Sequence, residues 1–195
     1  MPIGLGLSND MRRRIARFDD RVDTLFGKLR GHPVSDRVFY GATNVGEHGI
    51  VWFLLGALRG LRSEHDWHAA VRVGVGLTVE SVVVNLGVKT LFRRTRPPWE
   101  VDRPFAIRRP LTSSFPSGHA TSAFTAAVLL SDDDVLWPAY YALAAVVATS
   151  RVYVKIHHAS DVAGGIALGL LMGHAARRVF PLPVRPAESL TGSGG

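Results

Sequence analysis

Apolar residues recur along the chain with the spacing of helices. No segment sustains the period-two alternation that a half-buried strand shows, so strands are not expected. Between the apolar stretches lie polar turns and, over residues 93–118, a loop with five prolines and six arginines. The pattern predicts an all-α protein whose apolar stretches cover about 44–61, 67–92, 119–131, 135–150 and 160–176.

The lengths of these stretches suggest a membrane bundle. A helix needs roughly 20 residues to cross a bilayer, which the second stretch supplies and the first supplies only marginally. The last stretch carries Gly165, Gly169 and Gly173 at four-residue spacing. Such a stripe of small residues lets membrane helices approach closely. We therefore predict an integral membrane helical bundle of about five spans.

The N-terminal segment has a different character. Its arginines alternate with apolar residues such as Phe18, Val22 and Leu25, which lays one apolar stripe along a helix. No uninterrupted apolar core with a small-residue cleavage site follows, so no signal peptide is expected. We predict a basic amphipathic helix at the membrane interface, with packing on a soluble core as the alternative. The predicted organisation is an interfacial segment (1–41), a catalytic transmembrane bundle (42–180) and a disordered tail (181–195).

The amino-acid composition excludes several classes of protein and indicates the charge of the binding partner. Hydrophobic residues make up 47% of the chain, which excludes a disordered protein. The net charge is +7, and 20 of the 23 basic residues are arginine, which suits an anionic partner. The basic residues are split among helix ends and one loop without an aromatic stacking surface, so no nucleic acid is expected. The absence of cysteine excludes disulfides and thiolate chemistry.

Two short stretches carry residue types that bind phosphate. Lys89 and Arg96 place two cations at the end of the second long helix, although basic residues also anchor membrane helices there. Ser117, Gly118 and His119 open the next apolar helix, whose first N–H groups have no internal partner and can cradle phosphate oxygens. The alternative is structural, with Ser117 as a helix cap and His119 as a polar first-turn residue.

A third stretch, residues 150–161, adds a candidate nucleophile. His157 and Asp161 are four residues apart, so on a helix they share a face, and the carboxylate can accept the imidazole Nδ1–H. That bond leaves Nε2 with a free lone pair, and it stabilises the positive ring formed when the histidine attacks phosphorus. The alternative is a helix N-terminus capped by Ser160, with Asp161 in its first turn.

Together the three stretches resemble the signature of the type-2 phosphatidic-acid phosphatase superfamily. That signature reads Lys-x6-Arg-Pro, then Pro-Ser-Gly-His, then Ser-Arg-x5-His-x3-Asp. All three elements are matched without a gap or substitution, by Lys89, Arg96 and Pro97, by Pro116, Ser117, Gly118 and His119, and by Ser150, Arg151, His157 and Asp161.

The resemblance implies a phosphatase that needs neither metal nor cofactor and forms a covalent phosphohistidine. It implies that His157 is the nucleophile, that Asp161 orients it, and that His119 protonates the leaving oxygen. Fixed cations and amide dipoles can stabilise the charge that phosphoryl transfer spreads over the equatorial oxygens. The residues that the resemblance assigns to this task are Lys89, Arg96, Ser117, Gly118 and Arg151.

The apolar stretches favour the membrane branch of the superfamily, in the plasma membrane of a bacterium, with membrane lipids and a lipid phosphate as partners. The alternatives are a soluble acid phosphatase of the same superfamily and a membrane scaffold without catalysis. The arginine-rich, lysine-poor composition is compatible with a high-GC bacterium, and a polyprenyl-linked substrate would suit an actinobacterium. A homo-oligomer and the role of His158 stay open. Glu80 lies in the middle of an apolar helix, where a carboxylate often marks function, and the alternatives are a buried pair with an arginine and exposure to a water-filled cleft.

Charge predicts the orientation. With five spans, the side that carries the active-site loops holds 17 of the 23 Lys and Arg residues, counting Lys89. The positive-inside rule then places the active site on the cytoplasmic face, although membrane members of the superfamily more often work at the outer face. A cytoplasmic site suits a polyprenyl-linked sugar phosphate such as decaprenyl-phosphoryl phosphoribose phosphate. An outward site suits undecaprenyl pyrophosphate or a phosphatidate-type lipid.

Overall fold

The computed structural model describes residues 8–98, 103–108 and 112–184, and over these ranges the chain is helical with no strand. The α-helices are α1 (Asn9–Gly27), α2 (Pro33–Val45), α3 (Ile50–Gly60), α4 (Glu64–Val82), α5 (Lys89–Leu91), α6 (Gly118–Leu130), α7 (Trp137–Tyr153) and α8 (Ala159–Val179). A 3-10 turn, η1 (Glu47–Gly49), joins α2 to α3, and a π-helical segment, η2 (Val83–Val88), joins α4 to α5. The all-α prediction is confirmed.

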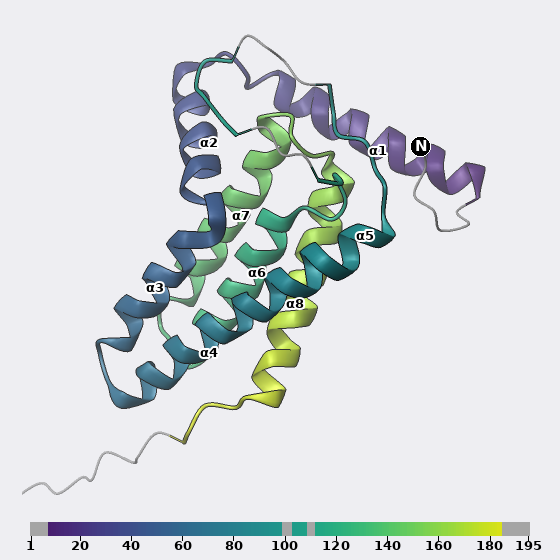
Figure 1. The fold of residues 1–195 in the computed structure, drawn as a ribbon. Helices are drawn as coiled ribbons and strands as arrows, with labels where there is room; N and C mark the ends of the chain where they lie inside the picture. The colour runs from purple at the N-terminus through teal and green to yellow at the C-terminus, as the bar shows by residue number, and fades with distance from the viewer. Residues whose placement is uncertain (1–7, 99–102, 109–111, 185–195) are drawn as a thin grey trace, which may run out of the picture.

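Helix α6 lies at the centre of the bundle and packs against α4, α7 and α8 (Figure 1). Helix α3 packs on α4, α2 packs on α7, and α1 runs across the ends of α7 and α8. Every α6 residue from Ala123 to Leu130 except Phe124 is buried. The site begins at the N-terminal end of this buried helix, so its position is fixed by the core.

The predicted glycine stripe forms the contact between α6 and α8. A Cβ on Gly169 would lie 2.4 Å from the Thr121 carbonyl oxygen, and one on Gly165 would lie 2.6 Å from that of Ser117. Real Cβ atoms do not approach so closely. Only glycine therefore allows the two helix backbones to reach this separation, which brings the start of α8 against the start of α6.

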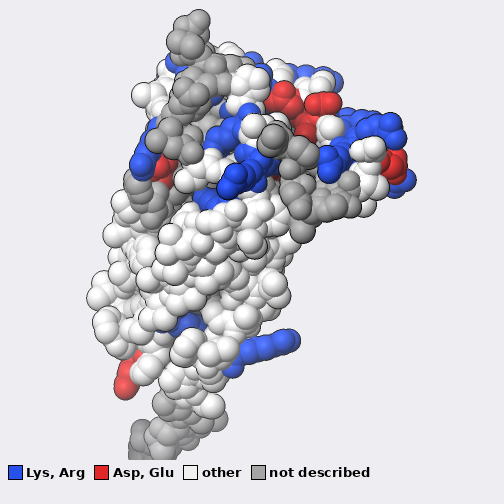
Figure 2. Space-filling model, turned by 45° about the vertical axis from the view of Figure 1, so that its right-hand side comes forward, with Lys and Arg blue, Asp and Glu red and all other residues white. Residues whose placement is uncertain are grey.

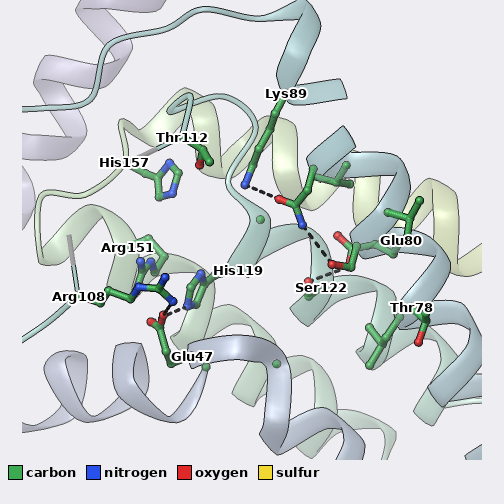
Figure 3. A pocket seen from close by; sticks show the side chains of 18 of the residues that line it. Glu47, Thr78, Glu80, Lys89, Arg108, Thr112, His119, Ser122, Arg151 and His157 are labelled. Carbon is green, nitrogen blue, oxygen red and sulfur yellow. Dashed lines mark hydrogen bonds and ion pairs between the residues drawn. The ribbon is translucent and has the colours of Figure 1, made fainter. Parts of the chain in front are cut away.

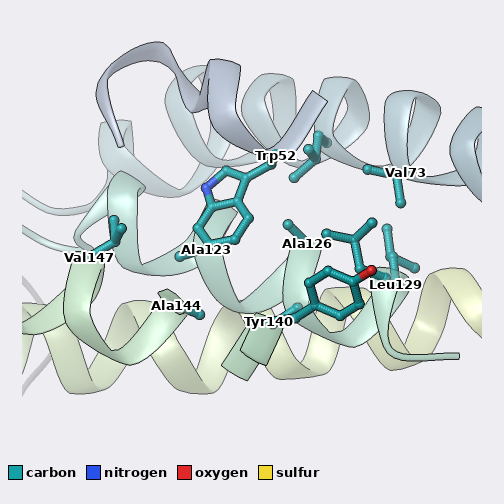
Figure 4. Packing of buried hydrophobic residues seen from close by; sticks show 11 residues of the cluster. Trp52, Val73, Ala123, Ala126, Leu129, Tyr140, Ala144 and Val147 are labelled. Atoms are coloured by element: carbon teal, nitrogen blue, oxygen red, sulfur yellow. The ribbon is translucent and has the colours of Figure 1, made fainter. Parts of the chain in front are cut away.

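A hydrophobic cluster fills the interior of the bundle from the site towards the far end. Trp52 of α3, Val73 of α4, Leu129 of α6 and Tyr140 of α7 pack together there (Figure 4). Trp52 is 1% exposed, so the cluster joins four helices around one buried indole ring.

Buried ion pairs close the end of the bundle that is far from the site. Arg59 Nε lies 2.9 Å from Asp66 Oδ1, and Arg72 Nη2 lies 2.6 Å from Asp132 Oδ2. Arg59 also donates to the Leu130 carbonyl at 2.7 Å. These contacts tie the α3–α4 connection to the turn after α6, so this end of the bundle is fixed by structural pairs.

The surface has the distribution of charge that a membrane protein needs. Figure 2 shows charged side chains gathered at the end that carries α1, with a broad uncharged band below and few charges at the far end. The segments Glu64–Leu91 and Ala159–Val179 are each long and apolar enough to cross a membrane. Helices α3 and α6 are shorter, and the predicted span 44–61 is interrupted at η1. The count of five spans stays a prediction.

The N-terminal segment forms two helices. Helix α1 is amphipathic and exposes most of its arginines, but it buries Asp19 against the bundle. Helix α2 packs on α7. The interfacial role of residues 1–41 stays a prediction. Of the predicted disordered tail, residues 181–184 have no regular secondary structure, and 185–195 lie outside the described residues.

Candidate active site

The three sequence stretches meet at one end of the bundle. They border a cavity of about 650 Å³ that is lined by Lys89, Arg96, Gly118, His119, Arg151 and His157 together with residues of α4. Figure 3 shows Lys89, His119, Arg151 and His157 around one hollow. Two predicted residues lie just behind the cavity wall, because Ser117 and Asp161 are fully buried and do not line it.

The N-terminus of α6 forms one wall. Ser117 caps the helix by accepting the Ala120 N–H at 3.5 Å, and its own N–H donates to the Asp161 carbonyl at 3.1 Å. The N–H groups of Gly118 and His119 come next, where a helix offers no internal acceptor. A Cβ on Gly118 would lie 3.2 Å from Lys89 Nζ. The glycine therefore leaves room for an ammonium group beside the positive end of the helix.

His157 does not share a helix face with Asp161, contrary to the prediction. Helix α8 begins at Ala159 with His158 as its cap, so His157 precedes the helix in the turn that follows α7. The two side chains still meet, with His157 Nδ1 at 3.7 Å from Asp161 Oδ2. That distance exceeds the length of a hydrogen bond, and the two groups form an ion pair only when the ring is positively charged.

The other nitrogen of His157 defines its tautomer. Nε2 lies 3.1 Å from Arg96 Nη1, and a guanidinium can only donate, so Nε2 is the acceptor and carries the lone pair. The ring proton is then on Nδ1, facing Asp161. Burial, with smaller contributions from Arg96 and Arg151, lowers the pKa of His157 to about 3 although Asp161 opposes this shift. The resting ring is therefore neutral, with its lone pair beside the cavity.

Asp161 is held by groups that the sequence did not single out. Arg94 Nη1 lies 2.6 Å from its Oδ1, and Ser114 Oγ donates to its Oδ2 at 2.6 Å. The His158 N–H also donates to Oδ2, at 2.9 Å. Arg94 Nη2 reaches Asp19 of α1 at 2.6 Å as well. One guanidinium thus links the N-terminal helix to the carboxylate behind His157.

The two arginines of the signature differ in their surroundings. Arg96 donates to the carbonyls of Thr112, Ser113 and Ile156 at 3.0–3.1 Å, so backbone holds its guanidinium in place. Burial lowers the pKa of Arg96, but the group stays cationic.

Arg151 is 2% exposed and donates to Thr43 Oγ1 at 3.2 Å. Its Nε has no hydrogen-bond partner among the described residues. A buried guanidinium with an unused donor beside a cavity is suited to an oxyanion.

His119 faces a carboxylate that the sequence analysis missed. Its Nε2 lies 3.5 Å from Glu47 Oε2, and Glu47 is contributed by η1, between α2 and α3 (Figure 3). Glu47 stands at the charged start of the apolar run 45–61, but nothing local to that position points to a histidine 72 residues later. The arrangement gives the second histidine an acidic neighbour of its own.

The structure also answers what the sequence left open. Glu80 lines the cavity and accepts a hydrogen bond from Ser122 Oγ at 2.8 Å, so the cleft option holds and the arginine pair does not. His158 caps α8. Among the residues that the structure describes, no group of three His, Asp or Glu side chains could hold a metal ion.

Comparison with known proteins decides the family. The model of the PAP2 superfamily matches residues 69–184, which include all three stretches. The chain belongs to the PAP2 superfamily. It is 38% identical over 139 residues to the decaprenylphosphoryl-5-phosphoribose phosphatase of Mycobacterium tuberculosis, covering 68% of this chain and 73% of that protein.

Solved structures agree on the fold. The crystal structure of Aquifex aeolicus LpxE superimposes with a TM-score of 0.65 at 27% identity, covering 81% of this chain and 93% of that one. A transmembrane PAP2-type phosphatidylglycerolphosphate phosphatase from Bacillus subtilis gives a TM-score of 0.59 at 21% identity, with 88% and 87% covered. The predicted family, the helical membrane architecture and the assignment as a phosphatase are confirmed.

Proposed function

We propose that this PAP2 phosphatase removes the terminal phosphate of a polyprenyl-linked sugar phosphate, of the decaprenyl-phosphoryl phosphoribose type, through a phosphohistidine on His157. The mycobacterial relative named for that substrate supports the substrate class. The observation that carries the mechanism is the lone pair of His157 Nε2, which lies at a cavity bordered by Lys89, Arg96 and Arg151.

The first half of the reaction forms the covalent intermediate. The substrate phosphate accepts hydrogen bonds from Arg96, Arg151 and Lys89 and from the first N–H groups of α6. Arg96 then turns its Nη1 donor from His157 to a phosphate oxygen, which frees Nε2 to attack phosphorus. The P–O bond to the sugar breaks, and the ring of His119 gives its proton to the leaving oxygen. Asp161 stabilises the positive charge of the phosphorylated imidazole.

The second half releases phosphate. His119, now neutral, takes a proton from water, and the resulting hydroxide attacks phosphorus. The P–N bond breaks, inorganic phosphate leaves, and His157 returns to its neutral form. Glu47, 3.5 Å from His119, stabilises the proton that the ring takes from water and holds until the next substrate is cleaved.

The test is phosphate release by the detergent-purified protein from decaprenyl-phosphoryl ribose 5-phosphate in the presence of EDTA. We expect turnover without added metal, inhibition by vanadate, and a loss of at least 10²-fold in His119→Ala and His157→Ala. His174→Ala is the matched control, because this histidine is exposed, does not line the cavity and hydrogen bonds to the Leu170 carbonyl of its own helix. Turnover by His157→Ala at the level of His174→Ala would contradict the proposal. The absence of turnover in the wild type would favour the silent scaffold.

We further propose that the site opens to the cytoplasm, as the positive-inside rule predicts. The chain has no cysteine, so a single one at Ala106, an exposed loop position, gives a clean label site. A membrane-impermeant maleimide should label Ala106→Cys in inverted vesicles and leave it unlabelled in intact cells. Labelling of intact cells would place the site on the outer face.

A further inference from the structure

The cavity continues beyond the phosphate-binding cations along one side of α4. Its volume of about 650 Å³ is in the range of pockets that hold whole small molecules, so a phosphate group fills only part of it. The additional wall is polar where α6, η2 and the end of α4 form it. Its polar residues, which we call the α4 polar wall, are Glu80 and Ser81 of α4, Asn85 of η2 and Ser122 of α6. The mechanism above uses none of these four residues.

Glu80 is the unusual member of this wall. It is 1% exposed and lies within an apolar helix, where an ionisable side chain marks a functional site. Ser122 Oγ donates to its Oε2 at 2.8 Å, and no described residue donates to its Oε1. A buried carboxylate with one hydrogen bond retains unused acceptor capacity. Since Glu80 lines the cavity, a ligand in the cavity can supply the missing donor.

The remaining members line the cavity between Glu80 and the phosphate end. Lys89 Nζ donates to Asn85 Oδ1 at 2.9 Å, and Asn85 Nδ2 donates to Ser81 Oγ at 3.1 Å. Asn85 belongs to the π-helical segment η2, and π-helical distortions are frequent at functional sites. Figure 3 shows Lys89, Glu80 and Ser122 on the same side of the cavity. Hydroxyl, amide and carboxylate groups therefore continue directly from the cation that meets the phosphate.

We propose that the α4 polar wall is a subsite for hydroxyl groups on the part of the substrate next to the phosphate, with Glu80 accepting a hydrogen bond from one of these hydroxyl groups. Hydrogen-bond acceptors and neutral donors recognise a polyol or a sugar, because each hydroxyl group can donate to one of them and accept from another. The enzyme then prefers a sugar phosphate to a phosphate attached directly to a hydrocarbon. This inference rests on the proposed function for the position of the phosphate.

Two substrates that differ only in hydroxyl groups test the subsite, namely polyprenyl-phosphoryl ribose 5-phosphate and its 2,3-dideoxy analogue. Hydrogen bonds to a charged group make up to about a 100-fold difference, so we expect wild-type kcat/KM to favour the ribose form by 10- to 100-fold. In Glu80→Gln the preference should fall to within about 3-fold, while the dideoxy substrate is hydrolysed at close to the wild-type rate. Ser122→Ala should reduce the preference in the same direction.

Thr78→Val is the matched control, since Thr78 stands on the same helix but its hydroxyl is bonded to the Gly74 carbonyl at 2.8 Å. This variant should keep the wild-type preference. Equal losses on both substrates in Glu80→Gln, or no preference in the wild type, would overturn the subsite. If instead the proposed function is wrong, the wild-type protein will release phosphate from neither lipid. Binding of the two lipids to His157→Asn then gives the same comparison without turnover, and equal affinities would refute the subsite.

Discussion

Removing Arg94 should impair catalysis although this side chain does not line the cavity. Its guanidinium lies 2.6 Å from both Asp161 and Asp19. The exposed fraction of the side chain is 14% for Arg94, 0% for Asp161 and 7% for Asp19. Arg94→Ala therefore leaves two buried carboxylates without their shared cation. Breaking a buried pair from one side costs about 3–5 kcal/mol, so we expect a clear drop in thermal stability in detergent.

The catalytic effect follows from the contact between Asp161 and His157. Ser114 and the His158 N–H still hold one oxygen of the carboxylate in the variant, but Oδ1 loses its donor. Misplacement of a reacting group by about 1 Å can cost 10²-fold. We expect kcat to fall about 10²-fold with KM within a few-fold, because Arg94 does not contact the substrate. Arg94→Lys should recover part of the lost kcat, since lysine keeps the positive charge but cannot donate to both aspartates in the planar geometry of a guanidinium.

The assay is steady-state phosphate release together with the thermal midpoint of each variant. Arg93→Ala is the matched control, because this exposed neighbour carries the same charge on the same segment. A kcat for Arg94→Ala equal to that of Arg93→Ala would refute the link between Arg94 and His157. Loss of stability with unchanged kcat would leave Arg94 a purely structural residue.

Three further predictions concern charge and packing. Acidification from pH 7 to 5 should lower the free energy of unfolding, because His157 gains a proton near pH 6.5 in the unfolded chain, whereas its pKa in the folded protein is about 3. This difference in pKa lowers the free energy of unfolding by about 2 kcal/mol at pH 5, and the His157→Gln variant should lack this contribution in denaturant titrations at the two pH values. Gly169→Ala should destabilise by about 1–3 kcal/mol in thermal melts, since its Cβ would meet the Thr121 carbonyl, whereas Gly74→Ala, with open space around it, should be neutral or stabilising. Arg151→Lys should lower kcat/KM by about 10²-fold in phosphate release, because an ammonium cannot reproduce the fork; activity within 3-fold would show that charge alone suffices.

Much of the site could be predicted from sequence because each of its parts is local. The cap at Ser117, the glycine after it and the histidine that follows are neighbours in the chain, so their arrangement depends on one helix start. The glycines at four-residue spacing identified the face of α8 that meets α6. The arrangement of residues that are neighbours in the chain depends little on the rest of the fold, so the sequence predicts it.

The residues that were missed depend on contacts between distant segments. Arg94 is one of 20 arginines, and only the folded chain shows that it bridges Asp19 and Asp161, which are 142 residues apart. Glu47 reaches His119 because η1 interrupts the helical path between α2 and α3. His157 was assigned to a helix because its spacing to Asp161 fits one, yet a turn produces the same contact.

The covalent intermediate is the central claim, and trapping it is the most direct measurement. The protein would be mixed with p-nitrophenyl phosphate, whose leaving group needs little protonation, quenched in alkali and digested for mass spectrometry. We predict a phosphoryl group on the peptide that contains His157, more of it in His119→Ala because hydrolysis lacks its base, and none in His157→Asn. Turnover by the wild type and His119→Ala without a phosphorylated peptide, or with the phosphoryl group on another residue, would contradict the account.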